Sequence, residues 1–273
     1  MAKPDNFLGW ETPGKAFITG ASAGMGLCFA TELARRKFDL VLLARRKDRL
    51  EAAAAKLSSD FAVRCDIIPT DLSDIDNINK AIELIQKIDN LDILINNAGF
   101  ATIGNFTDVP IEKSMRMLHL HMAAPVLLTH AVLQGMLKQK RGAVINVSSI
   151  AAFALTSGNV MYDATKSFLA AFSENLQLEV KDAGIRIQSL CPGFTHTEFH
   201  EVGDFKDFDR TIIPSHLWMT PEKVVFLSLK ALEENKKIVF IPGWKNRFST
   251  WMITHSSFVR SIVQKQVKER NEK

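Results

Sequence analysis

The chain has 273 residues, a length that suits one large α/β domain or two small ones, and 47% of them are hydrophobic, which is ample for a buried core. Its formal net charge of +4 suits a phosphate-bearing ligand and is too small to indicate nucleic-acid binding. Cys28, Cys65 and Cys191 show no metal-like spacing, so we expect buried thiols in a reducing compartment and no disulfide framework.

Targeting and membrane patterns are weak in this sequence. Residues 1–10 lack the apolar stretch of a secretory signal. The most apolar long stretch, residues 118–137, is interrupted by three histidines and Gln134, which disfavours a membrane span. We therefore expect a soluble cytoplasmic protein.

From residue 15 to about residue 242, short runs rich in Val, Ile and Leu alternate with longer amphipathic stretches. The runs predict strands at 16–19, 40–44, 63–69, 93–95, 143–147, 186–190 and 238–241. The stretches predict helices at 25–36, 47–57, 75–88, 111–138, 162–181 and 221–234. Strands that are apolar on both faces are typical of a parallel sheet covered by helices on both sides. We predict a single doubly wound α/β domain with about seven parallel strands.

Two segments depart from this alternation. Residues 195–220 form a long irregular loop, which predicts a substrate lid, and this loop contains the aromatic residues Phe199, Phe205, Phe208 and Trp218. Residues 243–273 place apolar side chains at three- and four-residue spacing among Lys and Arg, which predicts a basic amphipathic helix. This tail could lie on a membrane surface, cover a neighbouring subunit or close over the pocket, and subunit packing is the plainest of the three.

The first predicted strand is followed by a glycine-rich turn, residues 19–26, with the sequence TGASAGMG. Glycines there let the chain turn tightly and let the backbone approach a pyrophosphate, while the amides and dipole of a helix start favour negative charge. The spacing is GxxxGxG and not the GxGxxG dinucleotide fingerprint. Glycines also close ordinary turns, but this position between a strand and a helix favours a phosphate site.

Four more landmarks follow the turn in chain order: Asn96-Asn97-Ala98-Gly99, Ser149, Tyr162-x-x-x-Lys166, and Pro192-Gly193 with Thr197. Together they resemble the short-chain dehydrogenase/reductase family over roughly residues 14–242. The resemblance implies a Rossmann fold and a nicotinamide-dependent oxidoreductase. It also implies a homodimer or homotetramer, because helices equivalent to 111–138 and 162–181 pair across subunits in that family.

The same resemblance implies a set of cofactor-binding residues. Asp71 corresponds to the family residue at the adenine, Asn97 to the one on the adenosine side, and Thr197 to the one at the nicotinamide or pyrophosphate. The whole set is Gly20, Ser22, Ala23, Gly24, Met25, Gly26, Arg45, Arg46, Asp71, Leu72, Asn97, Ala98, Gly99, Tyr162, Lys166, Pro192, Gly193, Thr195 and Thr197.

The end of the second predicted strand bears on the choice between NADP(H) and NAD(H). A carboxylate there accepts from the ribose 2′-OH, whereas an arginine accommodates a 2′-phosphate. The strand ends in Arg45-Arg46, and Asp39 lies at its other end, so we predict NADP(H) with Arg45 as the main contact. Alternatively, both arginines solvate the next helix. Ala23 stands where many NADP-binding relatives carry a basic residue.

Proton transfer is assigned to Tyr162, the only tyrosine in the chain, with Lys166 on the same helix face. An ammonium beside the phenol is expected to lower the Tyr162 pKa, and Ser149 to hold the substrate oxygen. Ser149 is preferred to Ser148 because the family spacing to the tyrosine is thirteen residues. His121 falls where the family has an active-site Asn, so it is either part of a proton relay or a packed helix residue.

The predicted function is hydride transfer between NADP(H) and a carbonyl or secondary alcohol, with a small-molecule substrate. Phe194, Phe199, Trp218 and Met219 could line an apolar substrate pocket or simply anchor the lid. His196 and His200 show no metal-ligand pattern, and no metal site is predicted. The alternatives are a nucleotide-binding sensor or scaffold whose tail binds membranes or partners, and an epimerase or dehydratase on the same fold.

Overall fold

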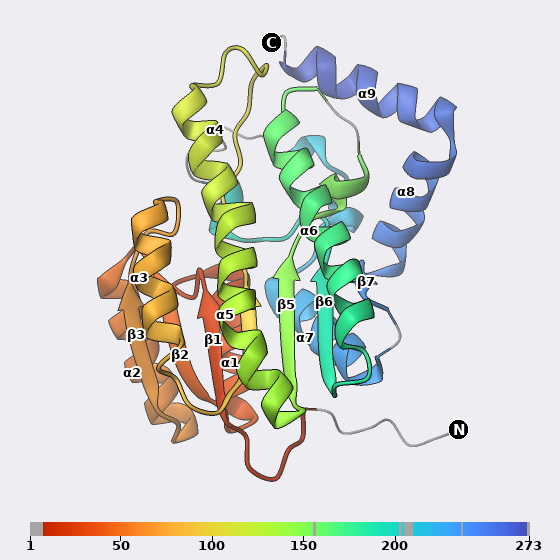
Figure 1. Cartoon of the computed structure of the whole chain (residues 1–273). Helices are drawn as coiled ribbons and strands as arrows, with labels where there is room; N and C mark the ends of the chain where they lie inside the picture. The colour runs from red at the N-terminus through yellow and green to blue at the C-terminus, as the bar shows by residue number, and fades with distance from the viewer. Residues whose placement is uncertain (1–7, 155–156, 202–203, 205–209, 236, 272–273) are drawn as a thin grey trace.

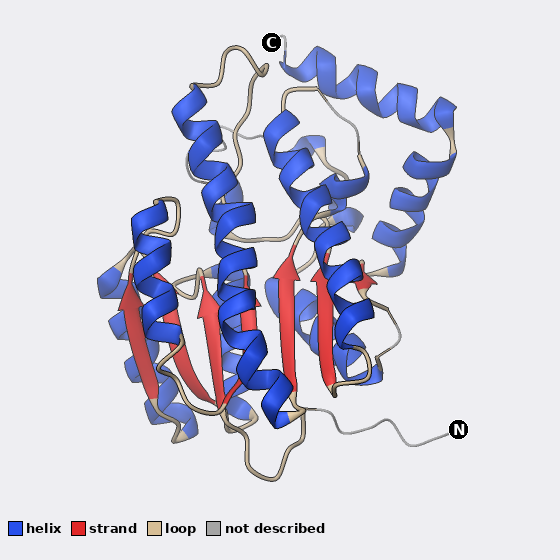
Figure 2. Cartoon of the chain, viewed as in Figure 1, coloured by secondary structure: helices blue, strands red, loops and turns tan. Residues whose placement is uncertain are grey.

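The computed structural model describes residues 8–154, 157–201, 204, 210–235 and 237–271. Within these residues, seven strands form one parallel sheet in the order β3-β2-β1-β4-β5-β6-β7 (Figures 1 and 2). The predicted doubly wound α/β fold is confirmed. The strands are β1 Lys15–Thr19, β2 Asp39–Ala44, β3 Cys65–Pro69, β4 Leu91–Asn96, β5 Gly142–Val147, β6 Ile185–Leu190 and β7 Val239–Phe240.

Helices cover both faces of the sheet, with α3, α5 and α6 on one face and α1, α2 and α7 on the other (Figure 1). Successive side chains of a strand point to opposite faces, so Phe17 joins one buried cluster and its neighbour Ile18 the other. This double burial explains the apolar runs in the sequence. The helices are α1 Gly24–Arg35, α2 Lys47–Phe61, α3 Ile75–Ile85, α6 Val160–Val180 and α7 Pro221–Glu234.

The segment predicted as one helix at 111–138 has three parts: α4 Ile111–Leu118, a π-helical turn at His119–Ala123, and α5 Ala124–Gln139. Together they are long and apolar enough to cross a membrane. Leu128 and Met136 are fully buried in the core cluster beneath them, so α5 is a covering helix of the sheet. π-Helical turns often mark functional sites, and this one contains His121.

The tail forms two helices, so the prediction of one continuous helix was wrong. Helix α8 spans Trp244–His255 and α9 spans Ser257–Asn271, with Ser256 in an extended conformation between them. Helix α8 contacts the turn Ile150–Phe153, which directly follows Ser149, and the lid turn Ser215–Leu217. Helix α9 lies at the end of the molecule to which the strand arrows point (Figure 1).

The segment predicted as a lid lacks strands in its described part and contains short 3-10 turns at Glu198–His200, Arg210–Ile212 and Ser215–Leu217. Phe205 and Phe208 lie outside the described residues. The glycine turn, Asn97, Ser149 and Pro192 follow the carboxyl ends of β1, β4, β5 and β6. Strand order reverses between β1 and β4, which is where doubly wound sheets bind their ligands.

Candidate active site

In the glycine turn at residues 20–26, the three glycine positions are too tight or too strained for a side chain. Gly20 has φ +67° and Gly24 has φ +54°, a region that favours glycine. A Cβ at Gly26 would lie 2.2 Å from the Gly20 carbonyl oxygen. Helix α1 begins at Gly24 with Ala23 as its N-cap, and no side chain caps the amides of its first turn. This arrangement fits a pyrophosphate, because a close backbone and uncapped amides at a helix start are what such a group requires.

Hydrogen bonds of Asn97 and Thr19 hold the glycine turn in place. The Asn97 side-chain amide donates to the carbonyls of Thr19 at 2.9 Å and Gly20 at 3.3 Å. Thr19 Oγ1 accepts from the backbone amides of Asn97 at 2.9 Å and Ala98 at 3.0 Å. The Asn97 amide therefore ties the end of β4 to the glycine turn and holds that turn in shape.

The two arginines after β2 have different surroundings. Arg45 has a 69% exposed side chain, and its guanidinium lies 3.9 Å from Asp71. Arg46 donates to Ser22 Oγ of the glycine turn at 3.2 Å and pairs with Glu198 of the lid at 2.9 Å. Arg49 binds the other oxygen of the same carboxylate. The alternative, in which both arginines only solvate the start of α2, does not hold for Arg46, because it pairs with Glu198 and contacts Ser22.

Asp71 stands at the other side of the expected adenosine site. Its carboxylate accepts from the Ser73 amide at 3.0 Å and from Arg116 at 3.0 Å. Its pKa is lowered: burial alone would raise it, but the hydrogen bonds from Ser73 and the charges of Arg45 and Arg116 outweigh that effect. Asp71 is thus an anion, and the next residue, Leu72, is 3% exposed and belongs to the core.

Tyr162 and Ser149 meet where α6 begins and β5 has ended. Ser149 caps the turn Ile150–Phe153, with its Oγ accepting from the Ala151 amide at 3.1 Å. Burial raises the Tyr162 pKa to about 12, against a usual 10.0, although its hydrogen bond with Ser149 acts to lower it. The expected lowering of this pKa by Lys166 is not found. The phenol therefore keeps its proton at neutral pH.

Lys166 lies one helical turn further along α6 and is 5% exposed. Its Nζ donates to the Val147 carbonyl at 2.9 Å and lies 5.5 Å from the centre of the Tyr162 ring. Burial lowers the Lys166 pKa to about 8. A Cβ at Gly99 would be 3.7 Å from Nζ, so Gly99 also borders the ammonium.

His121 is buried beside this pair, with its ring centre 5.8 Å from that of Tyr162. Its Nε2 accepts from the Phe100 amide at 3.2 Å, and its Nδ1 lies 3.0 Å from Thr165 Oγ1. Burial and the charge of Lys166 hold the His121 pKa well below its usual 6.5. The hydrogen bonds with Phe100 and Thr165 occupy both ring nitrogens.

The lid reaches both the glycine turn and Tyr162. Thr197 lies against Gly24, where a Cβ would come within 3.2 Å of its side chain. The Phe199 ring centre is 6.1 Å from that of Tyr162. Thr195 is 3% exposed and donates to the Gly193 carbonyl at 3.0 Å, while the Pro192 carbonyl accepts from Ile150. Most predicted site residues thus gather at one edge of the sheet; Met25 packs against the core instead.

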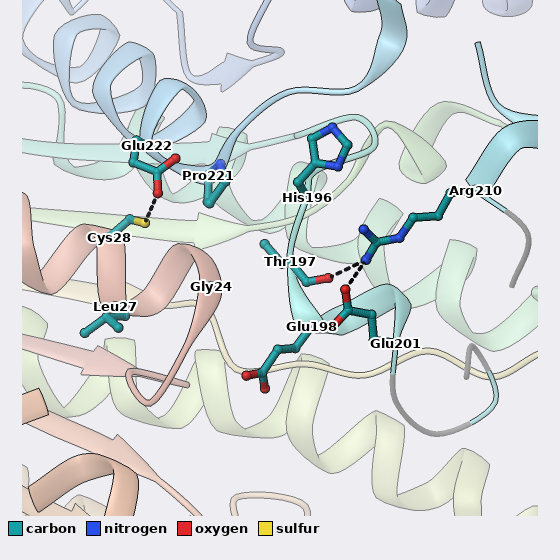
Figure 3. Close-up of a pocket in the computed structure, with 10 residues that line it drawn as sticks. All are labelled: Gly24, Leu27, Cys28, His196, Thr197, Glu198, Glu201, Arg210, Pro221 and Glu222. Carbon is teal, nitrogen blue, oxygen red and sulfur yellow. Dashed lines mark hydrogen bonds and ion pairs between the residues drawn. The ribbon is translucent and has the colours of Figure 1, made fainter. Parts of the chain in front are cut away.

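A cavity of about 410 Å³ opens between the start of α1 and the lid (Figure 3). Within it, Arg210 donates to the Thr197 carbonyl at 3.4 Å and pairs with Glu201 at 2.6 Å. Phe194 and Trp218 pack together beside it at 5.4 Å between ring centres, with His196 stacked on Trp218 at 4.8 Å. Across the described residues, no group of three His, Cys, Asp or Glu could hold a metal ion.

Sequence reasoning missed several residues that shape the site. Thr19 could have been found, since it opens the glycine motif at the end of the first strand. No local sequence pattern marks the other three residues. Thr165 and Phe100 bind His121, and Glu198 binds Arg46. Glu198 and Arg46 are 152 residues apart in the sequence, so only the fold brings them together.

Comparisons with known proteins agree with this geometry. Residues 15–204 match the short chain dehydrogenase family. The chain is 35% identical over 228 residues to the NADP-dependent 3-hydroxy acid dehydrogenase of Schizosaccharomyces pombe, covering 81% of this chain and 88% of that protein. It is 31% identical over 202 residues to the human inactive hydroxysteroid dehydrogenase-like protein 1, covering 73% of this chain and 61% of that protein.

A similar solved structure is the short-chain dehydrogenase from Sphingobium yanoikuyae in complex with NADPH. It is 31% identical in sequence, has a TM-score of 0.78, and the alignment covers 88% of this chain and 92% of that chain. The family match covers well over half of the sequence, and the sheet order, glycine turn and clustered Ser149, Tyr162 and Lys166 accompany it. The chain belongs to the short-chain dehydrogenase family of oxidoreductases.

Proposed function

We propose that the protein is an NADP(H)-dependent oxidoreductase that interconverts a carbonyl compound and a secondary alcohol. The observation that carries this proposal is the clustering of Ser149, Tyr162 and Lys166 beside a glycine turn that fits a pyrophosphate. A relative 35% identical is an NADP-dependent 3-hydroxy acid dehydrogenase, and a solved structure 31% identical contains NADPH. Both support this cofactor and this type of reaction.

The residues near the end of β2 would distinguish the two nicotinamide cofactors. Arg45 and Arg46 would bind the 2′-phosphate, with Ser22 as a neighbouring hydroxyl that already accepts from Arg46. Two described acids lie beside these arginines: Glu198 pairs with Arg46 at 2.9 Å, and Asp71 lies 3.9 Å from Arg45 but is also paired with Arg116. A 2′-phosphate is thus met by two cations, which favours NADP(H).

The protonation states suit the reduction direction. When bound, the nicotinamide supplies the hydride that adds to the carbonyl carbon. Tyr162 gives its phenolic proton to the carbonyl oxygen, and its raised pKa ensures that this proton is present at neutral pH. Ser149 would donate to the same oxygen and hold it close to the phenol. Lys166, with its pKa lowered to about 8, is still mostly an ammonium at neutral pH and would stabilise the phenolate that remains.

His121 would position this group and not carry protons. Its two nitrogens are taken by Phe100 and Thr165, and the low pKa keeps the ring neutral. Its ring stands edge-on to Tyr162 at 72°, so it buttresses the phenol. We therefore favour the packed role over the relay role.

The decisive experiment measures the turnover of a panel of ketones and keto acids with NADPH and with NADH. Wild-type protein should reduce some of them with NADPH, and Tyr162→Phe, which removes only the hydroxyl, should lose about 10²- to 10⁴-fold in kcat. Its NADPH dissociation constant should change far less than its kcat. Arg45→Ala should weaken NADPH binding much more than NADH binding. Equal losses of affinity for both cofactors would mean that Arg45 only solvates the start of α2.

Two outcomes would favour the other functions. NADPH binding without turnover of any carbonyl would favour a sensor or scaffold. This outcome is tested separately because one relative is called inactive. Conversion of a substrate without net change in NADPH absorbance would favour an epimerase or dehydratase. Undiminished turnover by Tyr162→Phe would remove the proposed proton donor.

A further inference from the structure

Helix α8 presents an aromatic face to solvent. Trp244, Phe248, Trp251 and His255 follow one another at intervals of four, three and four residues, which places them on one side of a helix. The first three are 66%, 57% and 54% exposed. Phe248 stacks on Trp251 at 6.3 Å between ring centres, and Trp251 on His255 at 5.3 Å. We call these four residues the aromatic stripe.

The opposite face of α8 fixes the direction in which the aromatic stripe points. Asn246 and Thr250 are 4% and 7% exposed. The Asn246 side-chain amide donates to the Pro242 carbonyl at 3.3 Å, and a Cβ at Gly193 would lie 2.7 Å from it. A helix that covers only a protein core would turn its aromatic residues inward. Here the polar face is inside and the aromatic face is outside, which indicates a surface that binds something.

The charge around the aromatic stripe is positive and favours an anionic partner. Residues 244–273 contain seven Lys and Arg against two Glu, a net charge of +5, so the rest of the chain carries −1 out of the total of +4. Helix α8 contains no acidic residue. Lys245 and Arg247 flank the stripe and are exposed, and Lys245 Nζ lies 5.8 Å from the Trp244 ring centre.

We propose that the aromatic stripe with Lys245 and Arg247 docks on the surface of an anionic lipid bilayer. Tryptophan rings prefer the membrane interface, and basic side chains next to them attract anionic headgroups. A second copy of the chain is disfavoured as the occupant, because a symmetric contact would bring two positively charged segments together.

Docking would orient the candidate active site. The inner face of α8 contacts the turn that follows Ser149 and the lid turn Ser215–Leu217. Helix α9 is held to α8 by Arg260, which donates to the carbonyls of Ile253 at 3.1 Å and Thr254. Its Phe258 is 74% exposed. Helix α8 would thus both lie on the membrane and border the lid.

Co-sedimentation of the full chain with vesicles tests this docking. Vesicles of phosphatidylcholine alone are compared with vesicles that also contain phosphatidylglycerol. We expect binding to the mixed vesicles, weakened by salt. The variant Trp244→Ser/Phe248→Ser/Trp251→Ser should bind about 100-fold more weakly. Lys245→Gln/Arg247→Gln should lose about 30-fold, and only on anionic vesicles.

The matched control is Phe106→Ser/Phe226→Ser, which removes two aromatic residues that are 53% and 50% exposed elsewhere. It should bind vesicles like the wild type. No sedimentation of the wild type, or equal binding to both kinds of vesicle, would overturn the proposal. So would a change of oligomeric state in the triple variant without vesicle binding, since that would assign the stripe to a second copy. Turnover of a water-soluble carbonyl should stay unchanged in every variant, which separates this test from that of the proposed function.

Discussion

The imidazole of His121 and the hydroxyl of Thr165 meet across two helices, with Nδ1 3.0 Å from Oγ1. Thr165 donates its own proton to the Tyr162 carbonyl at 2.9 Å, so its oxygen accepts from the imidazole Nδ1–H. Nε2 must then be the unprotonated nitrogen, which is the form that accepts from the Phe100 amide. Neighbouring groups thus specify one neutral tautomer.

This arrangement predicts how His121 variants behave. His121→Ala removes the acceptor of the Phe100 amide and the donor to the Thr165 oxygen, and should lower the free energy of unfolding by about 1–3 kcal/mol. His121→Gln can offer one acceptor and one donor and should recover most of that loss in chemical denaturation. The pH profile of kcat should show no step near 6.5 that depends on His121. A step there in wild type that is absent from His121→Gln would restore the relay role.

Glu198 and Arg46 lead to a prediction about cofactor choice. The Glu198 carboxylate binds Arg46 at 2.9 Å, at the place proposed for the 2′-phosphate, and hydrogen bonds from Arg46 and Arg49 lower its pKa. A phosphate would compete with this carboxylate. Both side chains are about 40% exposed, so the competing ion pair is weak.

Glu198→Gln should therefore tighten NADPH binding about two- to fivefold at low salt and leave NADH binding unchanged. Calorimetric titration with both cofactors measures this difference. Glu201→Gln, which changes a lid carboxylate paired with Arg210 instead, is the matched control and should affect both cofactors alike. Weaker NADPH binding by Glu198→Gln would mean that the carboxylate supports the bound state.

The sequence predicted the features that depend on local pattern. The short, near-continuous apolar runs located the seven described strands, and the glycine spacing located the tight turn between β1 and α1, because neighbouring residues decide both. The break at Ser256 was not predictable, since the apolar spacing continues through it. The pKa of Tyr162 was predicted in the wrong direction. Lys166 is four residues away on the helix, but its ammonium turns to the Val147 carbonyl, and burial of the phenol dominates.

That pKa can be measured directly, because Tyr162 is the only tyrosine in the chain. Ultraviolet absorbance of tyrosinate should show an ionisation midpoint above the usual 10.0 in the cofactor-free protein, toward about 12. At pH 10 most of the phenol should still be protonated, while circular dichroism verifies that the chain is folded. Tyr162→Phe supplies the baseline. A midpoint at or below 10 would show that the Lys166 charge outweighs burial.

Lys166 gives a prediction about stability and pH. Its pKa is about 8 in the folded chain against a usual 10.5, so between these values the unfolded chain binds more protons. Stability therefore rises with pH across that window, and below pH 8 the buried ammonium costs about 3 kcal/mol.

Lys166→Met removes the charge and keeps an unbranched apolar side chain, although it leaves the Val147 carbonyl without its donor. That loss does not depend on pH, whereas the charge cost does. The stability of the variant minus that of wild type should therefore fall as pH rises from about 8 to about 10.5. Urea denaturation at several pH values measures the difference, with the exposed Lys80→Met as control. A difference that stays constant over this range would mean that Lys166 is solvated in the folded protein. Its pKa would then be that of a surface lysine, and its ammonium would be fully charged at neutral pH.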